Sequence, residues 1–338
     1  MNKVKANQTI YFKHKPKIIS GYAIVGPKEG KGPLGEEFDY VMKNDTFEEK
    51  TYEMAERKMV EHSILGAVDK SGLVLKQIDM LLSGDLLNQI ISSSYAARAF
   101  DITYLGLFGA CSTMAESLAI GATLVDGNYF KNVACATVSH FSTAERQFRF
   151  PLELGNQRPP TSQWTATAAG CSIVSLKGKG PVITSATFGK VMDYGITDVN
   201  NMGGAMAPAA MSTLIALFRD TKTKPEDYDF ILSGDLGKFG SEILIELMQE
   251  QGFDISGIHD DCGKMIFNDK QNTLMGGSGC GCSASVLNSL ILKRFKNNLY
   301  KKIIFIATGA LLSTTASQQG ESIPGVAHAI VIENEGEE

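Results

Sequence analysis

The sequence of 338 residues lacks the features that mark disulfide-rich, nucleic-acid-binding, membrane-spanning or exported proteins. It has only six cysteines, and they lie in apolar or Gly/Ser-rich segments rather than in a disulfide framework, which favours folding in a reducing compartment. The formal net charge of −5 supplies no basic field, so nucleic acid is not an expected partner. The sequence shows neither a signal peptide nor an apolar run of roughly 18 residues, so we expect no transmembrane segment and no general export.

Proline is also scarce, whereas glycine is abundant: ten prolines stand against 34 glycines. This balance is typical of many tight strand-to-helix turns rather than of a disordered chain. The basic stretch 1–17 carries five lysines and one histidine and no acid. An anionic membrane surface attracts such an arm, although a solvated lead-in to the first strand is the alternative.

A short apolar segment places a single cysteine, Cys111, in an expected turn. Residues 106–110 are apolar and bounded by glycine, Cys111 follows, and small residues then open a helix. A thiol at a helix N-terminus feels the positive end of the helix dipole, so we expect the pKa of Cys111 to be lowered and its thiolate to be favoured. The alternative is a buried small residue that packs the helix against a sheet.

Strand and helix patterns alternate along the chain, which favours mainly parallel sheets. We expect residues 144–165 to form a loop and residues 177–180 to close a hairpin between the two strands that flank them. The expected strands are 18–26, 78–83, 105–110, 132–138, 168–176 and 181–188, and the expected helices are 47–68, 112–126 and 207–219.

The second half of the sequence repeats parts of the first. The segment 78–86, which contains Ser83-Gly84-Asp85, returns at 228–236 with Ser233-Gly234-Asp235. Cys111-Ser112 likewise returns as Cys282-Ser283. Self-similarity on this scale predicts two copies of one α/β unit, packed so that their Gly-rich turns approach one pocket.

This arrangement resembles the thiolase-like fold of thiolases and ketoacyl-ACP synthases over nearly the whole chain. Cys111 falls where those enzymes keep their acyl-accepting cysteine, residues 277–284 look like their Gly-His-Pro-x-Gly-x-Ser-Gly segment, and residues 325–333 resemble their last strand. The resemblance implies an α/β protein with two pseudo-duplicated halves, 1–190 and 191–338, in a layered α-β-α-β-α architecture. It also implies a homodimer.

The departures from that family concern proton transfer. Ser278 stands where the motif histidine would be, no second cysteine occurs around Ser322, and Asp235 lies where ketoacyl synthases place a histidine after a strand. A serine cannot serve as a general base near pH 7, and loss of such a partner costs about 10²–10⁴-fold in rate. We therefore predict that the chain is not an enzyme.

Two further segments resemble the stage V sporulation protein AD family of endospore-forming bacteria: residues 145–165, with Arg146, Arg149, Arg158 and Trp164, and residues 26–35. This resemblance implies a protein that binds dipicolinic acid (pyridine-2,6-dicarboxylate), with its calcium, and supports uptake into the developing spore. It further implies membrane-embedded partners of the same transport system and a peripheral position at the forespore or spore inner membrane. No cofactor and no resident metal are expected.

Several residues are predicted to contact the ligand, and a structural role is the alternative for them. Asp85 ends a strand where open α/β sheets bind ligands, or it caps its own turn. Arg158 offers a forked donor for carboxylates, and Trp164 a stacking face, or the arginine makes a surface ion pair. The full predicted set is Asp85, Cys111, His140, Arg158, Trp164, Ser278 and Cys280.

An ionised Asp85 would repel a dianionic ligand, so we expect either that it is protonated or that the ligand arrives as its neutral 1:1 calcium chelate. A zinc site from His259, Cys262, Cys280 and Cys282 is disfavoured because their spacing departs from known zinc motifs. Two other functions stay open: a condensing enzyme acylated at Cys111, and a pure scaffold for membrane partners.

Overall fold

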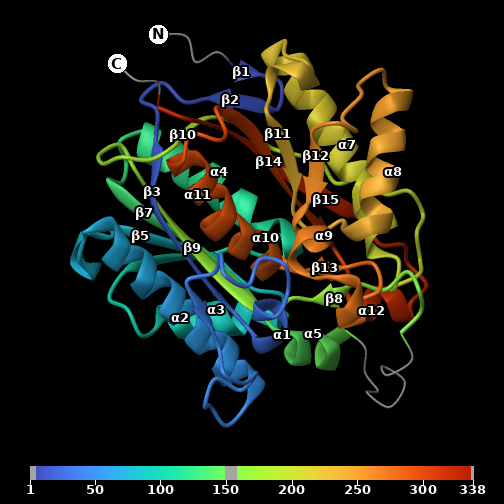
Figure 1. Cartoon of the computed structure of the whole chain (residues 1–338), viewed down its shortest axis with the longest axis horizontal. Coiled ribbons are helices and arrows are strands. Elements are labelled where there is room, and N and C mark those ends of the chain that lie inside the picture. Colours follow the sequence, from blue (N-terminus) through green and yellow to red (C-terminus); the bar gives the residue numbers. More distant parts are fainter. Residues whose placement is uncertain (1–4, 149–157, 336–338) are drawn as a thin grey trace.

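The computed structural model describes residues 5–148 and 158–335. Its main strands form two sets of five with the same order and sense (Figure 1). In the first set the order is β6 (Thr103–Gly106), β5 (Met80–Gly84), β7 (Asn132–Ser139), β9 (Ala168–Ser175) and β3 (Lys17–Val25). In the second it is β12 (His259–Asp261), β11 (Phe230–Ser233), β14 (Lys302–Ala310), β15 (Gly325–Glu333) and β10 (Val182–Thr187).

Each set pairs its first three strands in parallel and its last two antiparallel. The repeated Ser-Gly-Asp segments follow the strands β5 and β11, each of which is second in the order of its set. The repeat found in the sequence therefore occupies matching places in the two sets. The sets meet where β3 and β10 pair at a single position, Lys17 with Val182. Strand β10 precedes the expected boundary at residue 190 and pairs mainly with β15.

The pairing of β3 with β10 joins the two sets into one 13-stranded sheet, and helices occupy three layers around the sets (Figure 1). One outer layer holds α2 (Tyr52–Ser71) and α3 (Ile91–Ala97), and the other holds α7 (Met202–Thr221) and α8 (Gly237–Glu250). Between the two sets lie α4 (Thr113–Asp126) and α10 (Cys280–Val286), the latter continued by a π-helical turn (Leu287–Ile291) and α11 (Leu292–Lys296). The remaining elements are β1 (Lys5–Ala6), β2 (Thr9–Tyr11), α1 (Pro27–Gly30), β4 (Tyr40–Val41), α5 (Phe141–Phe148), β8 (Trp164–Thr165), α9 (Cys262–Ile266), β13 (Gly277–Ser278) and α12 (Thr314–Gln318).

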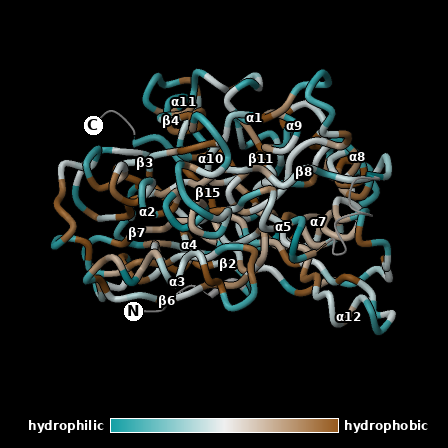
Figure 2. Tube along the Cα trace, turned by 90° about the horizontal axis from the view of Figure 1, so that it is seen from below, coloured by the Kyte–Doolittle hydropathy of each residue, from teal (hydrophilic) through white to brown (hydrophobic). Residues whose placement is uncertain are grey.

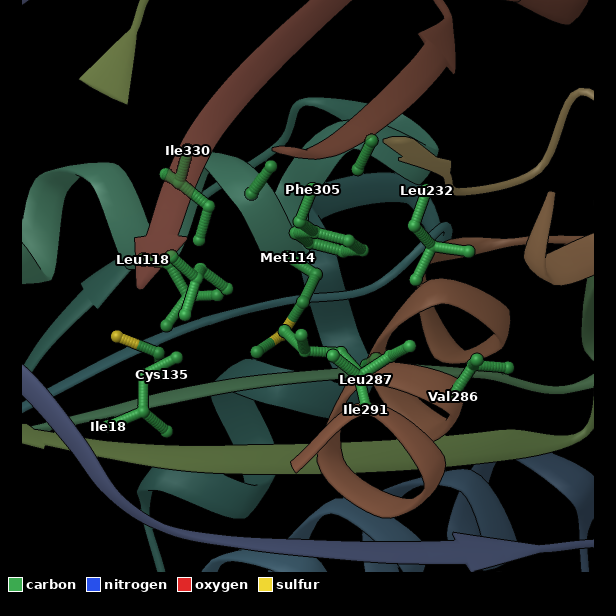
Figure 3. Packing of buried hydrophobic residues seen from close by; sticks show 14 of the residues in the cluster. Ile18, Met114, Leu118, Cys135, Leu232, Val286, Leu287, Ile291, Phe305 and Ile330 are labelled. Atoms are coloured by element: carbon green, nitrogen blue, oxygen red, sulfur yellow. The ribbon is translucent and has the colours of Figure 1, made fainter. Parts of the chain in front are cut away.

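The middle layer is apolar on nearly every side. All seven residues of α10 are buried, and α4 buries Met114 and Leu118 against Phe305 of β14 and Ile330 of β15 (Figure 3). Burial of each such side chain contributes about 1.5–3 kcal/mol of transfer free energy. Many of the hydrophilic stretches lie instead in loops at the margin of the molecule (Figure 2).

Three local predictions were wrong. The strands on either side of residues 177–180 form no hairpin, because β3 separates β9 from β10. The expected loop 144–165 begins with the last turns of α5, which runs to Phe148; residues 149–157, including Arg149, lie outside the described residues. Helix α2 begins at Tyr52 rather than at residue 47, because Phe47 and Glu48 have positive φ and Thr51 caps the helix by accepting from the Met54 amide.

No helix in the two described stretches has both the length and the apolar content that crossing a bilayer requires.

Candidate ligand-binding site at the Cys111 turn

Cys111 lies in a tight 3₁₀ turn, Ala110–Ser112, between β6 and α4. Ala110 has φ +50°, a left-handed conformation that costs an alanine roughly 1 kcal/mol or more. Strand β14 of the second half packs directly on this turn. A Cβ on Gly309 would come within 2.3 Å of the Gly109 carbonyl oxygen, so only glycine allows this approach. The turn is therefore built from both halves of the chain.

The Cys111 thiol does not have the lowered pKa predicted from the helix dipole. Burial raises its pKa well above the usual range, and the neighbouring Asp235 carboxylate raises it further. The dipole prediction was wrong because the thiol is only 7% exposed and removal from water opposes its ionisation. The thiol form is favoured at neutral pH.

Asp235 is a site residue that the sequence analysis did not select. It follows β11, is completely buried, and its Oδ1 accepts a hydrogen bond of 2.6 Å from Thr308 Oγ1 of β14. Its carboxyl group also faces the Cys111 thiol and the backbone amide of Gly279. Burial raises the pKa of Asp235 to about 7. Its position in the sequence, where ketoacyl synthases carry a histidine, was the indication that it approaches the cysteine.

A cavity of about 300 Å³ opens in front of Cys111. Its wall is mostly apolar, and Thr165, Ser278 and Ser313 contribute hydroxyl groups to it. No charged side chain lines it among the residues that the structure describes. The remaining lining residues are Leu86, Phe108, Ala110, Cys111, Phe148, Met202, Ala310, Leu311 and Leu312. Of the seven predicted ligand contacts, Cys111 and Ser278 line this cavity.

Asp85, His140 and Cys280 do not line this cavity, and each hydrogen-bonds to other parts of the chain. Asp85 Oδ1 accepts from the Leu87 amide at 2.8 Å and Oδ2 from the Ser93 amide at 2.7 Å. His140 Nε2 lies 2.7 Å from the Asp45 carbonyl oxygen. The Cys280 thiol donates to the Val138 carbonyl at 3.1 Å and packs in one apolar cluster with Cys111 and Leu86.

Arg158 and Trp164 form a separate cluster. The Trp164 ring stacks on Phe141 with centroids 3.7 Å apart, and Lys28 Nζ lies 3.9 Å above it. The Arg158 guanidinium lies 5.0 Å from the same ring and 3.3 Å from a Glu145 carboxylate oxygen. Arg158 also donates to the Gln163 carbonyl. These contacts brace the segment that leads into β8, and neither side chain lines the Cys111 cavity.

Metal-binding residue types do not gather around the cavity. Among the residues that the structure describes, no three His, Cys, Asp or Glu side chains are placed to hold a metal ion. His259 instead lies 2.9 Å from Ser233 Oγ, which also donates to Asp261 at 2.6 Å. Burial lowers the pKa of His259 to about 4, so it is neutral at physiological pH.

Comparison with known proteins supplies a family and a fold. The family model described as stage V sporulation protein AD matches residues 6–333. The curated protein named stage V sporulation protein AD from Bacillus subtilis (strain 168) is 45% identical over 334 residues, covering 99% of each chain.

Three solved structures of other proteins share this architecture. The 3-oxoacyl-[acyl-carrier-protein] synthase III of Aquifex aeolicus has a TM-score of 0.56 at 12% identity over 94% of this chain and 99% of its own. Acetamide-bound OleA of Xanthomonas campestris has a TM-score of 0.61 at 13% identity, covering 95% and 100%. Human mitochondrial 3-ketoacyl-CoA thiolase has a TM-score of 0.57 at 10% identity, covering 95% and 98%. The predicted thiolase-like fold is confirmed.

Proposed function

The chain belongs to the stage V sporulation protein AD family, and from that premise we propose that it binds dipicolinic acid in the Cys111 cavity, without turning it over, and supports its uptake into the developing spore. The observation that carries the proposal is a cavity of about 300 Å³, with space for one aromatic ring, at the place of a reaction centre whose thiol is held protonated. A protonated thiol is a poor nucleophile, so this wall serves a receptor better than an acyl acceptor.

The charge of the cavity favours a neutral form of the ligand. A free dianion would leave water for a wall on which no described residue carries a positive charge, and burying unpaired charge is costly. The buried Asp235 carboxyl behind Cys111 adds to that repulsion when it is ionised. We therefore propose the 1:1 calcium chelate as the bound form, with calcium held by the ligand rather than by a protein site.

Calorimetry with purified protein tests this proposal. Dipicolinate is titrated with and without equimolar calcium, and phthalate, which lacks the ring nitrogen, serves as the ligand control. Leu312→Trp fills the cavity from its wall and should weaken binding at least tenfold, whereas Leu299→Trp, at a 59% exposed position outside it, should not. Equal affinity with and without calcium contradicts the chelate, and undiminished binding to Leu312→Trp contradicts the site.

One observation favours a second function, that of a condensing enzyme acylated at Cys111. The Asp235 carboxyl faces the thiol and has a pKa of about 7, so it can accept the thiol proton near neutral pH. Incubation with acyl-CoA followed by intact-mass analysis decides the matter, with Cys111→Ala as the control. A thioester on the unmodified sequence that is absent from the variant supports the enzyme; a pure scaffold gives neither acylation nor dipicolinate binding.

We further propose that the protein acts as a homodimer, bound peripherally at the spore inner membrane beside membrane-embedded proteins of its transport system. Strand β6 is an edge of the sheet and carries exposed Leu105 (42%), with Ile91 and Tyr95 of α3 exposed nearby. Phe108 is 56% exposed and also lines the cavity, so a partner on this edge would complete the cavity wall. Sedimentation of the protein and of Leu105→Lys tests the dimer, which the variant should dissociate.

A further inference from the structure

A second hollow lies at the seam between the two halves, where β3 begins and α11 ends. Its volume is about 780 Å³, more than twice that of the Cys111 cavity. Apolar side chains form its floor, among them the fully buried Ile18 and Phe295 together with Ile19 and Leu292. We call this hollow the seam groove. None of its lining residues also lines the Cys111 cavity.

The seam groove contains a strand edge without a neighbouring strand. Strand β9 pairs with β3 along its whole length. On the other side of β3, and within the described residues, β10 pairs with it only at Lys17. Strand β4 pairs with it only at Ile24 and Val25. The stretch between, residues 18–23, therefore has a strand on one side only, and residues 18–21 line the groove. Its outward backbone groups are largely bonded within the chain: the Ile18 amide donates to the Pro181 carbonyl, Lys70 Nζ donates to the Gly21 carbonyl at 3.1 Å, and Ala23 exchanges hydrogen bonds with Asp39. The groove therefore offers its apolar floor and its rim, rather than a free strand edge, to a partner.

The rim of the seam groove is positively charged, although the whole chain carries a net charge of −5. Lys70, Lys179, Lys293 and Lys296 line it against only Asp39 and Glu335. Lys70 is paired with Asp39 and Lys293 with Glu37.

Two of the rim lysines have no such pairing. Lys179 and Lys296 are exposed and form no ion pair with any residue that the structure describes. Lys296 lies in the last turn of α11 and so also complements the helix dipole, but Lys179 lies in the 177–180 turn, where no helix ends.

We propose that the seam groove is a docking site for an acidic segment of a partner protein. The segment sets apolar side chains on the floor and places carboxylates beside Lys179 and Lys296. A concave groove with an apolar floor suits a peptide segment better than it suits a flat membrane surface. The inference is independent of the ligand in the Cys111 cavity.

A synthetic peptide probe tests the docking site by fluorescence anisotropy. The probe is a labelled ten-residue peptide of alternating Glu and Val, and the matched control alternates Lys and Val. The acidic peptide should bind and the basic one should not. The double variant Lys179→Glu/Lys296→Glu should weaken acidic-peptide binding about tenfold or more, because each reversal replaces an attraction by a repulsion. Both lysines are exposed, so the variant should fold.

Two further measurements separate the alternatives. Lys222→Glu/Lys238→Glu reverses two charges outside the groove and should leave peptide binding unchanged. Vesicles of phosphatidylglycerol and phosphatidylcholine probe a membrane instead: binding to vesicles, lost in the Lys179/Lys296 variant, without binding of the acidic peptide overturns the proposal. Equal binding of the acidic and basic peptides overturns it too. Dipicolinate titration of the same variant should be unchanged, so failure here is distinguishable from failure of the proposed function.

Discussion

Asp85 and Asp235 end equivalent strands of the two halves, and the two carboxyl groups act differently. Both carboxylate oxygens of Asp85 accept hydrogen bonds from backbone amides of its own half, those of Leu87 and Ser93. Asp235 keeps one side-chain hydrogen bond, from Thr308, and turns toward Cys111 of the other half. The same tripeptide thus closes a turn in one copy and forms part of the candidate site in the other.

Removing the Asp85 carboxyl group should have the largest effect on stability. Asp85→Ala leaves two buried amides without acceptors, and each such loss costs about 1–3 kcal/mol, so we expect the free energy of unfolding to fall by about 3–5 kcal/mol in urea denaturation. Asp235→Ala, which strips no comparable pair of amides, should lose much less. Equal losses in the two variants would show that the carboxyl groups have the same role.

The second largest effect should be the contribution of Asp235 to the pH dependence of stability. Asp235 has a pKa of about 7 in the folded chain, whereas an unfolded aspartate titrates near 3.9, so between these values only the unfolded state releases the proton. This group therefore lowers the free energy of unfolding as pH rises from about 4 to 7, and the loss is complete above 7.

Asp235→Asn removes that titration. Relative to the unmodified protein, we expect the variant to gain roughly 2–3 kcal/mol between pH 5 and pH 8, measured by urea denaturation at each pH. Other buried acids, such as Asp261 with a pKa of about 6, change stability in both proteins and cancel in the difference. A difference that does not vary with pH would mean that Asp235 is ionised throughout.

Thiol chemistry should show a smaller change. Cys111 is 7% exposed at the cavity, whereas the other five cysteines are fully buried, so iodoacetamide should modify Cys111 first. Asp235→Asn removes a carboxylate that raises the thiol pKa, and we expect alkylation at pH 8 to become several-fold faster, followed by peptide mass analysis. A slower reaction would instead identify Asp235 as the base that activates Cys111.

The smallest effect should come from Thr308→Val, which keeps the shape of the side chain and removes its donor to Asp235. The hydrogen bond from Thr308 lowers the pKa of Asp235, so its loss should shift the midpoint of the pH–stability profile upward by less than about one pH unit. A downward shift would contradict the assigned direction of this hydrogen bond. Thr137→Val in the first half, whose hydroxyl donates to the Cys280 carbonyl, is the matched control.

The parts that the sequence predicted correctly are those set by local pattern. The runs that became β5 and β11 are apolar and stop at Gly-Asp, so both strands and their ends could be located without knowing their neighbours. The 177–180 turn misled because strand pairing is non-local: β3, more than 150 residues earlier in the chain, inserts between β9 and β10. The residues around the turn give no indication that a distant strand separates the two strands that flank it.

The candidate site was only partly predictable for the same reason. Cys111 and Ser278 stood out by motif and do line the cavity. Asp235 did not, because its sequence context is nearly that of Asp85, and only the packing of β14 against the Cys111 turn brings it to the thiol. The prediction for the pKa of Cys111 was wrong because the helix start can be read from the sequence, whereas the burial of the thiol cannot.

The middle layer makes each half of the chain depend on the other for folding. Every residue of α10 is buried, and α4 buries Met114 and Leu118 against strands of the second half, while Glu116 and Asp126 stay half-buried on its other side. Either half made alone would expose this apolar surface to water, at about 1.5–3 kcal/mol for each large side chain uncovered. We therefore expect the two halves to unfold together, as one cooperative unit.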